Sequence, residues 1–108
     1  MAYERVVELV AQHRRRTRVL FAGPDTPEIY FLTESRNPTP SIMDFLDLEG
    51  TTRGRQLIRL LRDEEVPVVV LNHSPEQSSA LDPDTVARIR ATYPGVERTG
   101  QFEVRWLP

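Results

Sequence analysis

The sequence predicts an α/β domain with a partly parallel sheet, helices on its faces and an antiparallel hairpin at the C-terminus. Segments with apolar residues at helical spacing alternate with short apolar runs, as in chains that fold into α/β layers. The run Val66–Leu71 is almost continuously apolar and β-branched, which is typical of a strand buried on both faces. The closing stretch Phe102–Trp106 alternates apolar and polar residues just after Gly100 and Gln101, which indicates a hairpin.

The first thirty residues predict a helix, a strand and a turn. Residues 2–15 carry valines and a leucine at helical spacing, with acidic and amide residues between them. This helix ends in an arginine cluster, residues 14–16, whose charges complement the negative end of the helix dipole. An anionic partner or a lipid headgroup is the alternative role of these arginines. Arg18–Ala22 is expected to be a buried strand that ends at Gly23 and Pro24.

A second helix is expected directly after this turn, followed by a weakly patterned segment. Asp25 or Thr26 provides the cap, and Glu28 is placed to complete a capping box. The helix is expected to reach about Glu34, because the prolines that follow do not allow it to continue. Residues 42–48 are short and alternate poorly, and we interpret them as a strand.

The second half of the chain repeats the alternation. Residues 50–52 predict a turn, and leucines at helical spacing then predict a helix through about Glu65. Asp82 and Pro83 open another helix, and the hairpin pairs Val96–Thr99 with the closing strand. This order of elements predicts a Rossmann-like layered domain with right-handed crossovers.

Composition bounds the organisation and the class of function. The 108 residues fit one domain, residues 1–108, with 39% hydrophobic and 28% charged residues. There is no cysteine, all 14 basic residues are arginine, and the net charge is −2. We therefore expect a soluble domain with no disulfide, no metal site and no nucleic-acid partner. No apolar run approaches the length of a membrane-spanning helix.

Candidate binding residues cluster in two stretches after the first predicted strand. Asp25 lies beyond the carboxyl end of that strand, where α/β sheets bind ligands, although a helix cap is by itself a sufficient explanation. The loop that follows the second helix contains Arg36, Asn37 and Thr39, whose side chains can donate to a phosphate or a sugar. The alternative is that its prolines form a rigid turn and that Arg36 pairs with an acid.

Other polar stretches are less specific. Residues 50–55 combine glycines, hydroxyls and arginines before a helix, so phosphate binding is one reading and a capped turn is the other. The pair His73 and Ser74 lacks the strained turn that presents a nucleophilic serine. The sequence therefore predicts no catalytic residue in this domain.

Three stretches of the chain form one pattern when they are taken in order. They are Gly23–Thr33 continuing into Arg36–Thr39, Val66–Asn72, and Gly100–Trp106. Their order resembles the C-terminal domain of bacterial membrane glycosyltransferases related to dolichyl-phosphate-mannose protein mannosyltransferases and aminoarabinose transferases. Members of that family carry four features in this order: a YFL(S/T)GRRNPT stretch, a VV(V/L)N strand, a tyrosine-proline helix end and a G-x-F-x-V strand. The resemblance runs from about Val19 to the C-terminus and is most specific over Tyr30–Thr39. Glu34 and Ser35 stand here where the pattern has glycine and arginine, and Pro40 stands where arginine is common.

The resemblance implies a place and a role for the domain. It implies the C-type glycosyltransferase fold and a position on the extracytoplasmic face of a bacterial membrane, after the transmembrane helices of a larger protein. Such enzymes transfer a sugar from a polyprenyl-phosphate donor, and their catalytic acid lies in a loop between early transmembrane helices. The resemblance therefore implies an accessory domain without catalytic residue or cofactor. Its partners would be the transmembrane portion of the same polypeptide and the lipid-linked sugar or acceptor.

Two alternative functions remain open at this point. One is a self-contained α/β module that binds a nucleotide or phosphate at residues 50–55 or at the Asp25 helix start. The other is a protein-interaction domain that forms a homodimer through the N-terminal helix and the exposed edge of the closing hairpin.

Overall fold

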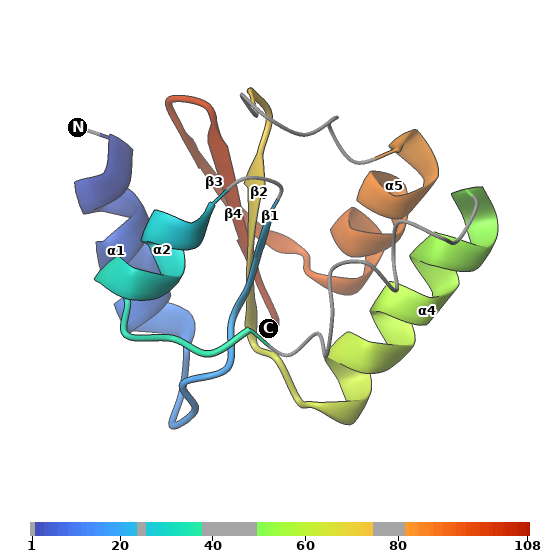
Figure 1. Cartoon of the computed structure of the whole chain (residues 1–108), viewed down its shortest axis with the longest axis horizontal. Coiled ribbons are helices and arrows are strands. Elements are labelled where there is room, and N and C mark those ends of the chain that lie inside the picture. Colours follow the sequence, from blue (N-terminus) through green and yellow to red (C-terminus); the bar gives the residue numbers. More distant parts are fainter. Residues whose placement is uncertain (1, 24–25, 38–49, 75–81) are drawn as a thin grey trace.

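The computed structural model of the chain describes residues 2–23, 26–37, 50–74 and 82–108, and it has helices on both faces of one sheet (Figure 1). The elements, in chain order, are α1 (Ala2–His13), β1 (Phe21–Gly23), α2 (Pro27–Leu32), α4 (Gly50–Asp63), β2 (Val68–Asn72), α5 (Pro83–Thr92), β3 (Gly95–Thr99) and β4 (Phe102–Trp106). None of the helices in these parts of the chain combines the length and the hydropathy that crossing a bilayer requires.

The sheet is mixed, with four strands in the order β1-β2-β4-β3. β1 and β2 run parallel, with Ala22 opposite Val70, and the other two pairs are antiparallel. The predicted α/β class, the partly parallel sheet and the C-terminal hairpin are therefore confirmed. β2 is a central strand and every one of its residues is buried, as the apolar run in the sequence predicts.

Two apolar clusters lie on the two faces of the sheet, and β2 contributes to both because its side chains alternate. Val68 and Val70 pack with α1 and α2, whereas Val69 and Leu71 pack with α4 and α5. Figure 1 shows the resulting layers, with α1 and α2 on one side of the strands and α4 and α5 on the other. The full first cluster is Val6, Leu9, Val10, Leu20, Ala22, Ile29, Val68, Val70, Phe102 and Val104.

The hairpin depends on glycine at two points. Gly100 adopts a left-handed φ of 57° between β3 and β4, which glycine tolerates at little cost. Gly95 lies under Trp106, and a Cβ at this position would collide with the indole. On its other side Trp106 stacks on His13, with 3.8 Å between the ring centroids, so the last strand is tied to the end of α1.

Several predicted boundaries are wrong, for identifiable reasons. α1 ends at His13 because Arg15 adopts a left-handed φ of 60°. The strand expected at 18–22 is β1 at 21–23, because Val19 and Leu20 pair with Arg36 instead of β2. The turn expected at residues 50–52 is the first turn of α4, whose apolar face packs on the sheet. The strand expected at 42–48 lies outside the described residues.

Candidate functional site

The segment from Tyr30 to Arg36 is held by hydrogen bonds from both of its ends, one to β1 and the other to the residues just before β1. The Tyr30 hydroxyl accepts from the Ala22 backbone N–H at 2.8 Å and lies 3.2 Å from the Ala22 carbonyl oxygen, to which it donates. Burial raises the pKa of Tyr30 to about 12, so the phenol stays protonated. At the other end the Arg36 N–H donates to the Arg18 carbonyl, and the Arg36 carbonyl accepts from Leu20. The segment is therefore a fixed extension of the sheet.

The turn within this segment has an unusual backbone. Glu34 adopts φ 53°, the left-handed region that a residue with a Cβ occupies at a cost. The hydroxyl of Thr33 donates to the Ile29 carbonyl at 2.7 Å, and the Ser35 N–H donates to the Tyr30 carbonyl at 2.9 Å. These bonds on either side of Glu34 hold it in place. Position 34 is also where the resembled pattern has glycine.

The structure brings only part of the predicted binding set together. Arg36 and Asn37 are adjacent and exposed at the edge of the Tyr30–Arg36 segment. The guanidinium of Arg36 makes no hydrogen bond or ion pair among the described residues. Asp25 and Thr39, the other two predicted ligands, lie outside the described residues.

The start of α2 differs from the predicted capping box. Thr26 is the N-cap residue, but its side chain makes no capping bond, and its buried hydroxyl has no partner in the described parts of the chain. Glu28 accepts a hydrogen bond from the Tyr3 hydroxyl at 2.7 Å and so joins α2 to α1. The prediction of a capping box is wrong because the N-cap is Thr26, so that Ile29 and not Glu28 occupies the third helical position, where the box needs its acid.

A buried charge cluster lies where β4 meets α5. The Glu103 side chain is only 2% exposed and accepts from Arg90 at 2.8 and 3.1 Å and from Arg105 at 2.7 Å. His73 Nε2 lies 2.8 Å from the same carboxylate. Chiefly through its bonds with Arg90, and then Arg105 and His73, the pKa of Glu103 is lowered to about 2. A carboxylate so strongly stabilised in its charged form is a poor proton acceptor near neutral pH, and its role here is to join β4, α5 and the end of β2.

The alternation in the closing strand places Glu103 on the polar face, but it does not reveal that α5 covers this face. The contact depends on Arg90, which is distant in sequence. His73, the one neighbour that the sequence singled out, approaches Glu103 and not a serine. The Ser74 N–H instead donates to the side chain of Asn72.

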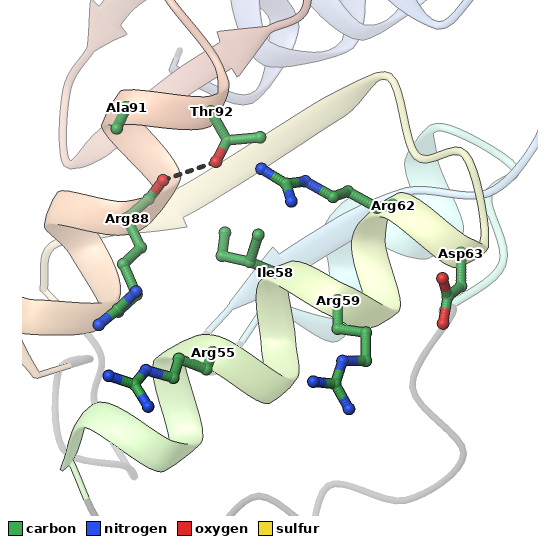
Figure 2. Close-up of a pocket in the computed structure, with 8 residues that line it drawn as sticks. All are labelled: Arg55, Ile58, Arg59, Arg62, Asp63, Arg88, Ala91 and Thr92. Atoms are coloured by element: carbon green, nitrogen blue, oxygen red, sulfur yellow. Dashed lines mark hydrogen bonds between the residues drawn. The ribbon is translucent and has the colours of Figure 1, made fainter.

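An arginine-lined groove runs between α4 and α5 (Figure 2). Its volume is about 590 Å³. Arg55, Arg59 and Arg62 line it from α4, and Arg88 faces them from α5. Arg88 pairs with Asp84 at 2.9 Å, whereas the three α4 arginines make no ion pair within the described ranges. The sequence predicts that the α4 arginines face solvent, but the groove itself depends on the packing of the two helices.

The remaining groove residues set its floor and rim. Ile58 and Ala91 supply apolar surface, and the Thr92 hydroxyl is used in a bond of 2.9 Å to the Arg88 carbonyl. Asp63 is the acid on the rim. A site of this composition, with four arginines and one acid, can attract an anion.

In the part of the chain that the structure describes, no group of three histidine or acidic side chains is placed to hold a metal ion. No protein-family model, curated protein or solved structure matches the chain.

Proposed function

We propose that this chain is the extracytoplasmic accessory domain of a membrane glycosyltransferase that takes its sugar from a polyprenyl-phosphate donor. In this proposal the domain carries no catalytic residue, and the transfer reaction takes place in the transmembrane portion of the same polypeptide. The domain stabilises that portion or shapes the access of the acceptor. The support comes from the resemblance over Tyr30–Thr39 and from the backbone of that segment.

The backbone of Glu34 is the observation that carries the proposal. The resembled pattern has glycine at this position, and the chain adopts φ 53° there. Glycine occupies this region of φ freely, so this backbone favours the glycine that the pattern has at position 34. The agreement between the glycine of the pattern and the backbone angle at Glu34 supports the idea that the resemblance reflects a shared local structure.

The tyrosine of the pattern has a physical role as well. The Tyr30 hydroxyl satisfies both the N–H and the carbonyl of Ala22, at the centre of β1. Phenylalanine could not do this. In this proposal the motif is a structural frame that presents Arg36 and Asn37 at the surface, where they are available to the transmembrane portion or to the lipid-linked substrate.

A Rossmann-like layering is part of the same proposal. It is supported by the parallel β1–β2 pair, with α2 and α4 in the connection between the two strands, and by helices on both faces of the sheet (Figure 1).

The test is the complete gene and the activity of its product. The proposal expects transmembrane helices upstream of this domain, and it expects sugar transfer from a polyprenyl-phosphate donor by the membrane-embedded product. Substitution of Tyr30 by phenylalanine in that product should lower its thermal stability without removing the transfer activity completely. A complete gene without any transmembrane helix contradicts the proposal.

A second candidate function, binding of a nucleotide or sugar phosphate, is favoured by the arginine-lined groove. Three cations on α4 without acidic partners among the described residues can bind a phosphate by charge-assisted hydrogen bonds. Calorimetric titration with nucleotides and sugar phosphates tests this candidate. Binding that disappears in Arg59→Gln supports it, and the absence of heat with every ligand contradicts it.

A further inference from the structure

We infer that one end of the molecule docks onto an anionic lipid surface. This docking face combines two exposed apolar side chains with arginines from two neighbouring segments. Its members are Arg15, Arg16, Arg18, Phe31, Leu32 and Arg36.

The apolar part of the docking face is the end of α2. Phe31 is 82% exposed and Leu32 is 46% exposed, although Ile29 of the same short helix is completely buried. Ile29 and the Tyr30 ring anchor the helix to the core, and Phe31 lies on the side of the helix away from Ile29. Leu32 is three residues after Ile29, so it lies closer to the buried side and is less exposed than Phe31. Single exposed apolar residues are common, but an almost fully exposed phenylalanine next to an exposed leucine is a candidate for insertion into another apolar phase.

The arginines lie beside this apolar pair because two segments of the backbone are joined there. Arg14 Nη1 donates to the Thr33 carbonyl at 2.7 Å, and the Arg36 N–H donates to the Arg18 carbonyl. Residues 14–18 therefore run alongside residues 33–36, directly after Phe31 and Leu32. Figure 1 shows the end of α1 and the end of α2 at the same side of the molecule.

The charge of the docking face is positive. The side chains of Arg16 and Arg36 are exposed and make no hydrogen bond or ion pair in the described ranges, and the Arg15 side chain donates to the Pro108 carbonyl. Arg18 pairs with Glu34 at 3.3 Å, with both side chains mostly exposed. Glu34 is the acid within the 33–36 segment, and Glu28 of α2 is occupied by the Tyr3 hydroxyl. The exposed ion pair between Arg18 and Glu34 is weak, so the Arg18 side chain can bind another anion instead.

A lipid surface fits these features together better than a free phosphate. Arginines attract anionic headgroups, and phenylalanine and leucine can enter the boundary between headgroups and acyl chains. A free phosphate would use the arginines and leave Phe31 in water. The long arginine side chains can also reach headgroups from slightly different depths. The inference uses only this surface and stands independently of the proposed glycosyltransferase.

The test is co-sedimentation of the chain with phospholipid vesicles. We expect binding to vesicles of phosphatidylcholine mixed with phosphatidylglycerol, weak binding to phosphatidylcholine alone, and a loss of binding as salt is raised. Phe31→Ser should weaken binding roughly tenfold, and Arg16→Gln and Arg36→Gln about fivefold each. Equal binding to neutral and anionic vesicles, or no binding to either, overturns the inference.

Matched controls place the binding on this face. Val96 on β3 is 46% exposed, as Leu32 is, so Leu32→Ser should weaken binding and Val96→Ser should not. Arg59 lies on α4, on the other side of the sheet from α2, so Arg59→Gln should leave vesicle binding unchanged (Figures 1 and 2). If Val96→Ser or Arg59→Gln weakens binding as much as Phe31→Ser does, the docking face is wrongly assigned. All of these side chains are exposed, and unchanged urea midpoints would show that the variants remain folded.

Discussion

Glu34 shows at the residue scale how a backbone requirement can be met by an unfavourable side chain. Its left-handed φ is held by the hydrogen bonds of Thr33 and Ser35, while its own carboxylate makes only an exposed ion pair with Arg18. The local structure therefore depends on the neighbours and not on Glu34 itself.

Glu34→Gly should stabilise the chain by about 0.5–1 kcal/mol, because glycine removes the cost of a Cβ at positive φ. Glu34→Ala is the matched control, since it also removes the ion pair but keeps the Cβ, and it should give no gain. Urea unfolding measures both. A glycine variant less stable than the alanine variant would show that the φ value at this position is not a source of strain.

Glu103 is an acid whose pKa the fold lowers strongly, chiefly through its hydrogen bonds with Arg90. The folded-state pKa of about 2 lies below the ordinary value of 4.5, so the unfolded chain binds the proton more readily. The stabilisation is therefore fully present above pH 4.5 and is lost as the pH falls from 4.5 towards 2. It corresponds to about 2–3 kcal/mol.

Glu103→Gln should lower the free energy of unfolding by about 2–3 kcal/mol near pH 7, and the difference from the unsubstituted chain should shrink as the pH falls from 4.5 towards about 2. Denaturant unfolding at a series of pH values measures this convergence. Glu97→Gln is the control, because Glu97 also pairs with an arginine but its side chain is 37% exposed, and it should have a much smaller effect. A difference that stays constant with pH would contradict the assigned ion pairs.

At the scale of elements, Arg14 is the link between α1 and the Tyr30–Arg36 segment. Its guanidinium donates to the Thr17 and Thr33 carbonyls and to the Ser35 hydroxyl, at 3.0, 2.7 and 3.0 Å. Burial, with the nearby charge of Arg18, lowers the pKa of Arg14, which shows that it is less solvated than an ordinary surface arginine. Within the cluster at residues 14–16, Arg14 therefore has a structural role, whereas Arg15 and Arg16 are exposed.

Arg14→Gln should destabilise the chain by about 2 kcal/mol, because it removes charge-assisted hydrogen bonds that join two elements. Arg16→Gln should change stability by less than about 0.5 kcal/mol, since its side chain is exposed. Thermal or urea unfolding of the two variants makes the comparison. Equal effects of the two substitutions would refute the distinction between the adjacent arginines.

The sequence predicts elements better than it predicts their partners. Periodicity locates β2 and the closing hairpin, and Asp82 caps α5 as expected, accepting from the Thr85 N–H at 3.0 Å. It does not show that Leu20 pairs with Arg36 instead of β2, because that choice depends on the path of the chain after α2. Local patterns are set by neighbouring residues, whereas such pairings are set by the assembled sheet.

The same limit applies to the sites. The sequence marks Arg36 and Asn37 as surface donors, and both are exposed. The Glu103 cluster and the arginine-lined groove each need residues from two elements brought together by packing, so no local pattern predicts them. The docking face has the same origin. The sequence predicts that Phe31 and Leu32 belong, with Ile29 and Tyr30, to the buried side of the second helix, and this prediction is wrong for Phe31 and Leu32, which are exposed.

At the scale of the whole molecule, the two faces of the sheet carry different surfaces. The docking face lies on the α1–α2 side and the arginine-lined groove lies on the α4–α5 side (Figure 1). The domain can therefore lie on a membrane through one side while the other remains accessible. This arrangement suits an accessory domain next to a membrane-embedded enzyme, which is the central proposal.

Labelling of one introduced cysteine tests that proposal most directly, because the chain has no cysteine of its own. Arg98 on β3 is exposed, so Arg98→Cys places a thiol at the surface and away from the docking face. The variant is expressed from its complete gene, with any other cysteines replaced, and bacterial spheroplasts are treated with a membrane-impermeant maleimide. The proposal predicts a membrane-bound product that is labelled in intact spheroplasts. Labelling only after the membrane is permeabilised would contradict it.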